Sequence, residues 1–160
     1  MTPISVSTGN RLGPDVDDGL TSMCAKIPGE GRAVLVGGDG LPMANSQGWE
    51  DVADIERIAA ATSSTLFSSL QLFGTPSGAG GSVSQVVIES PDTVVLLMRT
   101  AGTEENDPRL SHSILYLQIF DPAYVAVAAH QMTEHIKTLG THLAGVNRSP
   151  GSEHTSGIAG

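Results

Sequence analysis

The sequence is poor in the residues that form covalent cross-links, metal centres and membrane spans. Cys24 is its single cysteine, so neither an intrachain disulfide nor a zinc site built from cysteines can form. No apolar run approaches the ~20 residues that a membrane-spanning helix needs. Residues 1–10 lack the basic and apolar regions of a secretory signal peptide. We therefore expect a cytoplasmic protein that does not insert into membranes.

Positive charge is also scarce. The chain has 8 Lys and Arg residues against 17 Asp and Glu residues, which gives a formal net charge of −9. A surface of this sign repels the phosphates of nucleic acids and the headgroups of anionic membranes. Nucleic acid is therefore not an expected partner. The charge either serves solubility alone or complements a basic patch on another protein.

The motifs of common enzymes and cofactor sites are missing as well. The glycine clusters at 37–40 and 78–81 lack the lysine of a phosphate-binding loop, and each leads into an expected strand instead of a helix. His130 and His135 are five residues apart, which does not match the spacing of the H-E-x-x-H zinc motif. Asp15–Gly19 lacks the spacing of a calcium loop. We predict no catalytic, cofactor-binding or metal-binding residues.

Hydrophobic residues make up 39% of the chain, enough for one domain with a full core. We expect this domain at 13–140, with disordered tails at 1–12 and 141–160 and a polar loop at 101–112. Apolar periodicity and turn residues predict the elements inside the domain. The predicted helices are Pro14–Ile27, Trp49–Phe73 and Asp121–Leu139, and the predicted strands are Ala33–Val36, Leu41–Ala44, Val83–Glu89, Thr93–Arg99 and Ser113–Phe120.

The strands follow one another through short turns, which favours an antiparallel sheet. Val94–Met98 is apolar without alternation, so both faces of that strand should be covered by helices. Pro42 lacks an amide hydrogen and is typical of an edge strand. The sequence therefore predicts an α+β fold, an α/β/α sandwich around one five-stranded antiparallel sheet, in the order α-β-β-α-β-β-β-α.

The long helix predicted at Trp49–Phe73 has an unusually wide apolar arc. Its main stripe runs from Val52 through Leu66 to Phe73. Ile58 and Leu72 widen that stripe on one side, and Trp49, Ala60 and Phe67 widen it on the other. Packing one helix on one sheet does not need so wide an arc. A second apolar surface should cover the flank, and the same helix of a twin subunit is the simplest candidate.

Between about Pro14 and Gly140 the chain resembles the roadblock family, the dynein light-chain roadblock type with its bacterial relatives. The resemblance rests on the strand Ala33–Val36 followed by Asp39–Ala44, on the acidic start of the long helix from Glu50, on Gln85–Glu89, and on the closing helix from Asp121. It implies the roadblock/profilin-like form of the predicted sandwich.

The resemblance also implies a homodimer in which the long helices lie side by side and the third strands pair edge to edge. The dimer-interface residues would be Ala60, Ser64, Phe67, Gln71, Val83, Gln85 and Val87. It further implies binding to a Ras-like small GTPase, in some bacterial operons together with a sensor kinase. The GTPase-facing residues would be Met43, Asn45, Glu50, Asp54, Arg57 and Ala61.

Nothing in the sequence singles out Arg57 as an arginine finger. Any stimulation of GTP hydrolysis would therefore come from positioning the switch loops of the GTPase. Two other functions stay open at this point. One is a small-molecule-sensing domain, and the other is a structural scaffold that is indifferent to the bound nucleotide.

Overall fold

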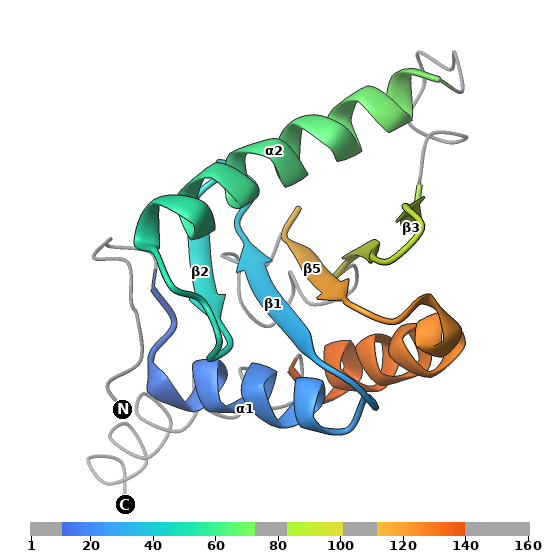
Figure 1. The fold of residues 1–160 in the computed structure, drawn as a ribbon. Helices are drawn as coiled ribbons and strands as arrows, with labels where there is room; N and C mark the ends of the chain where they lie inside the picture. The colour runs from blue at the N-terminus through green and yellow to red at the C-terminus, as the bar shows by residue number, and fades with distance from the viewer. Residues whose placement is uncertain (1–10, 73–82, 101–111, 140–160) are drawn as a thin grey trace, which may run out of the picture.

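The computed structural model describes residues 11–72, 83–100 and 112–139. Its elements are α1 (Pro14–Ala25), β1 (Gly31–Val36), β2 (Pro42–Asn45), α2 (Val52–Gln71), β3 (Gln85–Glu89), β4 (Val94–Arg99), β5 (Ile114–Ile119) and the 3₁₀ turn η2 (Pro122–Tyr124), after which a C-terminal helix occupies residues 125–139. Figure 1 shows their arrangement. The predicted element order is confirmed.

The five strands form a single antiparallel sheet in the order β2-β1-β5-β4-β3. The centre of the sheet joins distant parts of the chain, because Gly31 of β1 pairs with Ile119 of β5. β2 and β3 lie at the two edges, so the prediction that Pro42 belongs to an edge strand is confirmed. The β1–β2 turn closes with a 2.9 Å bond from the Gly40 amide to the Gly37 carbonyl. Gly40 has a φ of 82° there, which glycine adopts without strain.

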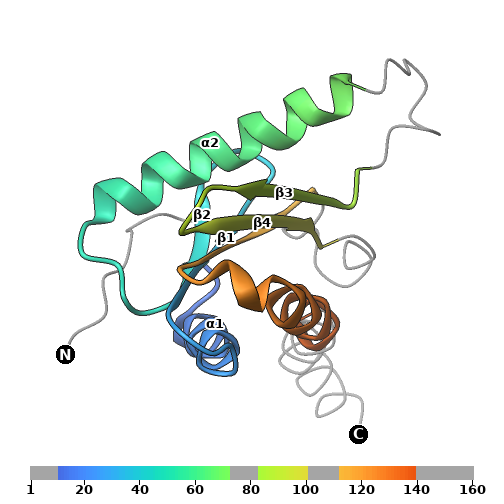
Figure 2. The ribbon, with the colours of Figure 1, turned by 45° about the vertical axis from the view of Figure 1, so that its right-hand side comes forward.

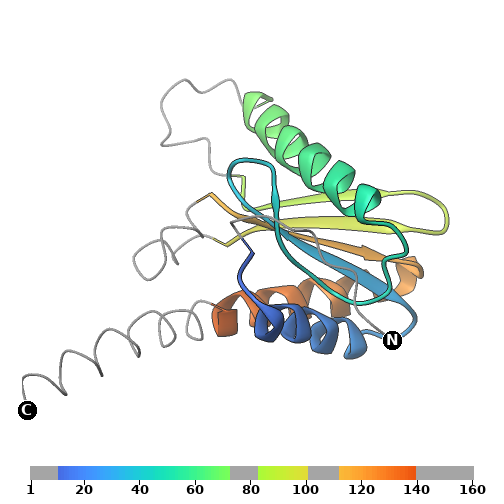
Figure 3. The same cartoon turned by 90° about the vertical axis from the view of Figure 1, so that its left-hand side faces the viewer.

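Helices cover both faces of the sheet, as the continuous apolarity of β4 predicted. α2 lies on one face, while α1 and the C-terminal helix lie on the other (Figures 2 and 3). Successive residues of one strand therefore enter different cores. Leu96 packs with the α1 side, whereas Leu97 packs with the α2 side beneath Ile55 and Tyr116. The fold is an α/β/α sandwich.

α1 begins where the sequence predicts. Pro14 occupies its first turn, and Asp15 and Asp17 lie near the positive end of the helix dipole. The stripe of Val16, Leu20 and Met23 is buried as expected. The helix ends at Ala25, two residues before the predicted end, although Ile27 is still buried in the same core.

α2 begins three residues later than predicted. Asp51 is its N-cap, and the Asp51 carboxylate accepts a 2.9 Å bond from the amide of Ala53. Trp49 therefore precedes the helix and does not widen its apolar stripe, so this part of the prediction was wrong. The indole is only 5% exposed in the α2-side core, and its Nε1 donates to the Ala33 carbonyl at 3.2 Å.

The C-terminal helix has the predicted start. The Asp121 carboxylate accepts a 3.0 Å bond from the amide of Ala123, with Pro122 in the first turn. Ala128, Met132 and Leu139 are buried against the α1 side of the sheet. The expected ends at Phe73 and Gly140, the 74–81 connector, residues 101–111 of the polar loop, and the tail at 141–160 lie outside the described residues. Of the predicted N-terminal tail, Arg11 and Leu12 are described, and both bond to the domain.

Candidate interaction surface

Along its outer edge, β3 has no partner strand among the described residues. Among the described strands, β3 pairs with β4 alone. Just beyond one end of this ladder, the Ser90 amide donates to the Thr93 carbonyl at 2.8 Å, and just beyond the other, the Arg99 amide donates to the Ser84 carbonyl at 3.3 Å. Residues 90 and 93, and residues 84 and 99, are therefore hydrogen-bonded pairs. Hydrogen-bonded pairs alternate along an antiparallel ladder. Val86 and Ile88 therefore direct their backbone groups toward β4. The N–H and C=O groups of Gln85, Val87 and Glu89 point outward, where no described strand pairs with them.

The second half of α2 leaves apolar side chains uncovered. Leu66 is the last buried residue of this helix. Beyond it, Phe67 is 66% exposed and Leu72 is 86% exposed. Large apolar side chains with such exposure, next to an open sheet edge, are typical of a protein interface. Ala60, Ser64, Phe67 and Gln71, the predicted dimer residues of α2, share one helix face and are all exposed.

The predicted dimer residues of β3 do not all lie on the α2 side. Val83 is half-buried beside the α2-side core. Gln85 and Val87 pair with Met98 and Leu96, whose side chains belong to the opposite core. Their side chains therefore face away from α2, and Val87 cannot join one patch with Phe67 on the sheet face.

Ile88 is the β3 residue that the sequence reasoning missed. It pairs with Val95, which packs with the α2-side core, and it is 49% exposed. Ile88 therefore extends the uncovered apolar surface on the same face as α2. The alternation of side chains along β3 is the signal that could have identified it.

Two predicted GTPase-facing residues are buried, so their assignment as contact residues was wrong. Met43 is 2% exposed and Asn45 is 3% exposed. Met43 packs in the α1-side core, and the Asn45 amide donates to the Asp17 carboxylate of α1 at 2.9 Å. The hairpin motif pointed to β2, but Met43 lies at the bulge of that strand and enters the α1-side core, while the Asn45 side chain accepts a bond from Arg11.

The other predicted GTPase-facing residues form an exposed line on and before α2. Glu50, Arg57 and Ala61 are exposed, and Asp54 is partly exposed. Asp54, Arg57 and Ala61 lie on one face of α2 at spacings of three and four residues, and Glu50 precedes the helix. Arg57 pairs with Asp54 at 3.1 Å. A solvent-exposed pair of this kind stabilises the helix little, so both side chains are free to exchange it for contacts with a partner.

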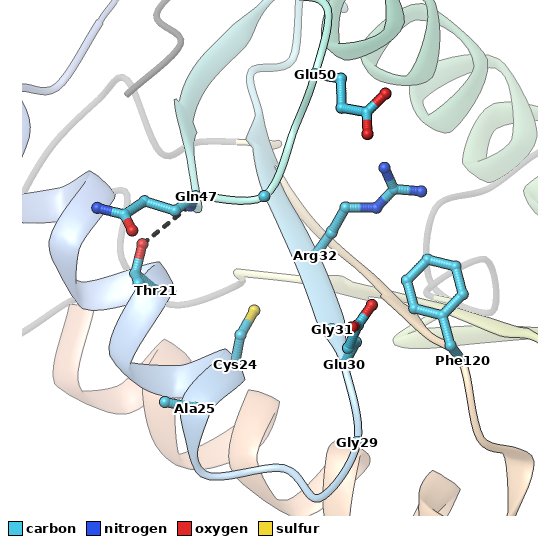
Figure 4. Close-up of a pocket in the computed structure, with 11 residues that line it drawn as sticks. Thr21, Cys24, Ala25, Gly29, Glu30, Gly31, Arg32, Gln47, Glu50 and Phe120 are labelled. Atoms are coloured by element: carbon cyan, nitrogen blue, oxygen red, sulfur yellow. Dashed lines mark hydrogen bonds between the residues drawn. The ribbon is translucent and has the colours of Figure 1, made fainter. Parts of the chain in front are cut away.

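A pocket of about 520 Å³ lies beside this line, between α1, the start of β1 and the segment before α2 (Figure 4). The Arg32 guanidinium lies over the rings of Trp49 and Phe120, 4.6 and 5.1 Å from their centroids. Arg32 also donates to the Gln118 side chain at 3.1 Å. Glu50 lines the pocket together with Arg32, so the pocket contains both signs of charge.

The sulfur of Cys24 also lines this pocket. Burial raises the pKa of its thiol to about 11, against a smaller lowering by the hydrogen bond with Ser46. The thiol is therefore protonated at neutral pH and a poor nucleophile. Within the described ranges, no three His, Cys, Asp or Glu side chains gather to hold a metal ion. No helix there has the length and apolarity needed to cross a bilayer.

Comparison with solved structures finds the same fold in bacterial proteins. A Roadblock/LC7 domain from Streptomyces avermitilis matches with a TM-score of 0.63 and 25% identity, over 79% of this chain and 96% of that one. MglB in a tetrameric arrangement matches with a TM-score of 0.62 and 13% identity, over 87% and 97%. Myxococcus xanthus MglB matches with a TM-score of 0.63 and 10% identity, over 82% and 96%.

The two MglB structures are similar to this chain in fold alone, at 13% and 10% identity. Searches with protein-family models and among curated protein sequences found no match. The Streptomyces domain shares both the fold and a quarter of its aligned sequence with this chain. Together with the predicted family resemblance, these likenesses show that the chain has the roadblock fold.

Proposed function

We propose that this chain is a non-catalytic, cytoplasmic homodimer that regulates a Ras-like small GTPase. The observation that carries the proposal is the open β3 edge beside the uncovered second half of α2. An open edge with an adjoining apolar face needs a partner to satisfy its backbone groups and cover its side chains. A second copy of the chain offers the same edge, and a two-fold axis lets both edges satisfy each other.

The register of this dimer follows from the outward-facing backbone groups of β3. An antiparallel pair centred on Val87 places Val87 opposite Val87 of the second copy and Gln85 opposite Glu89. This register uses every outward N–H and C=O group of the strand. It also avoids placing two Glu89 carboxylates opposite each other, which would be destabilising.

The exposed line of Glu50, Asp54, Arg57 and Ala61 is the surface that we assign to the GTPase. Its net charge is negative, so it complements a basic patch on the partner. We assign Arg57 to positioning the GTPase and not to stabilising charge in GTP hydrolysis.

Replacing Phe67 with Asp tests the helix part of the dimer. A buried carboxylate would face an apolar partner surface, so we expect the dimer dissociation constant to rise about thirtyfold or more. Light scattering and sedimentation velocity measure it. Ala53→Asp adds the same charge at the exposed start of α2 and should leave the dimer intact. A dimer of unchanged affinity in Phe67→Asp would contradict the proposed packing.

The GTPase part is tested by titration against a Ras-like small GTPase from the same organism, loaded with GDP or with a GTP analogue. We expect binding that depends on the nucleotide and weakens in Asp54→Lys. Equal binding of both forms would favour the nucleotide-indifferent scaffold. No binding of either form would exclude the GTPase proposal.

The pocket at Arg32 favours a second candidate function, a small-molecule-sensing domain. Its volume is large enough for a small metabolite. A thermal-shift screen of metabolites with wild type and Arg32→Gln tests this alternative. A ligand that stabilises wild type but not the variant would support it, and a screen without any such ligand would count against it.

A further inference from the structure

The two edges of the sheet differ in whether their outward backbone groups have partners: those of β2 bond to α1 and the segment before it. At β2, the Leu12 amide donates to the Met43 carbonyl at 3.0 Å, while the Asn45 amide donates to the Asp17 carboxylate at 2.9 Å. Two residues further, the Gln47 amide donates to the Thr21 hydroxyl at 3.0 Å. The Asn45 and Gln47 amides point away from β1, because the intervening Ser46 amide donates inward to Ala33. Met43 lies at the bulge where the β1–β2 register shifts, and its carbonyl is directed to Leu12.

Asp17 and Thr21 are four residues apart on α1, so they lie on the same side of that helix. Four residues rise about 6 Å along a helix, and two residues span about 6.8 Å along a strand. The two acceptors on α1 are therefore spaced like the outward amides of Asn45 and Gln47 to which they bond. Arg11 strengthens the arrangement, since its Nη2 donates to Asp17 at 3.1 and 3.2 Å and to the Asn45 side chain at 2.9 Å. The side chains of Arg11 and Asp17 are only 14% and 24% exposed. We call Arg11, Leu12, Asp17 and Thr21 the edge clamp.

We propose that the edge clamp restricts self-assembly to β3, and that releasing it lets β2 pair with a strand from a second copy of the chain. A sheet with one usable edge closes into a dimer, whereas a sheet with two usable edges adds copies without limit. The clamp therefore decides between a closed dimer and an open-ended assembly. The dimer state in this inference rests on the proposed function, but the clamp itself does not.

The double variant Asp17→Ala, Thr21→Ala removes two acceptors of the clamp and keeps good helix formers in α1. Asp18→Ala, Ser22→Ala is the matched control, because it also removes one carboxylate and one hydroxyl, one position along on exposed residues of the same helix. We expect the clamp variant to reach roughly double the wild-type mass or more as its concentration rises, since each new contact joins another dimer. The control should keep the wild-type mass. Sedimentation velocity measures both.

Adding Val87→Pro to the clamp variant separates the two edges. The Val87 amide points outward, so proline there removes a donor of the β3 edge without removing a β4 bond. Growth should then stop at pairs joined through β2. Val87→Pro alone should halve the wild-type mass. If it does not, the β3 dimer is wrong, while the comparison of clamp variant and wild type still tests the clamp.

A folded clamp variant with the wild-type mass at every concentration would overturn the inference. Circular dichroism establishes whether it is folded. If the double variant does not fold, hydrogen exchange on the wild-type chain gives the test. The Asn45 and Gln47 amides should then exchange slowly, and exchange as fast as in an unfolded peptide would overturn the clamp.

Discussion

At the scale of single residues, His135 lies where the C-terminal helix meets α1. Its Nε2 is buried and has no hydrogen-bond partner among the described residues. Gly19 of α1 lies against the ring, where an added Cβ would be 3.3 Å from Cε1. Burial lowers the pKa of His135 below its ordinary value, and the nearby Lys26 lowers it further. The contact between α1 and the C-terminal helix therefore depends on a neutral imidazole.

This environment predicts a loss of stability in mild acid. The unfolded chain takes up the His135 proton first as the pH falls, because the folded pKa is the lower of the two. The His135 contribution is full above about pH 6.5 and declines as the pH falls toward the folded pKa. Melting temperatures measured between about pH 8 and pH 5 should show a decline that is smaller in His135→Gln. The exposed His130→Gln is the control, and an equal decline in all three proteins would contradict the prediction.

Cys24 leads to a second prediction at this scale. Because its thiol pKa is about 11, folded protein should react with iodoacetamide much more slowly than the same chain in denaturant. Mass spectrometry follows the alkylation over time. Equal rates with and without denaturant would show that the thiol is not buried as described.

At the scale of elements, the caps decide where the helices start. Asp51→Ala removes the acceptor for the Ala53 amide and should lower the free energy of unfolding by about 1 kcal/mol. Urea unfolding followed by circular dichroism measures this loss. Glu50→Ala changes the neighbouring carboxylate, which lies outside the cap, and should cost less. Equal losses would mean that charge near the helix start, and not the cap bond, is responsible.

Helix and strand positions could be predicted because they depend on local periodicity and turn residues. The apolar stripe of α1 and the Asp121-Pro122 helix start are examples. Trp49 was misplaced because its apolar side chain continues a helical pattern that the Asp51 cap cuts off. Met43 and Asn45 were misassigned because periodicity does not reveal the bulge at Met43 or the tertiary bond between Arg11 and Asn45. The edge clamp also escaped prediction, since it depends on tertiary contacts between α1 and β2.

At the scale of the whole molecule, charge should control partner binding. The formal net charge is −9, and the proposed GTPase surface contains Glu50 and Asp54. Affinity for a partner with a basic patch should therefore fall as salt rises, because salt screens exposed charges. Calorimetric titrations over a salt series should show a shallower dependence in Glu50→Gln, Asp54→Asn. Glu134→Gln on the C-terminal helix should keep the wild-type slope, and a salt-independent affinity would contradict the assignment.

The central position of β5 also determines how the chain can reach its native state. β1 leaves the ribosome long before β5, yet six consecutive residues of β1, from Gly31 to Val36, pair with β5. The β1–β2 hairpin alone therefore exposes one ladder edge and both faces of β1 during synthesis. Such long-range pairing slows folding, because the intervening chain must first be ordered. The β1 edge of the nascent chain consequently stays unpaired until β5 has been made, and the sheet can be completed only after residue 119.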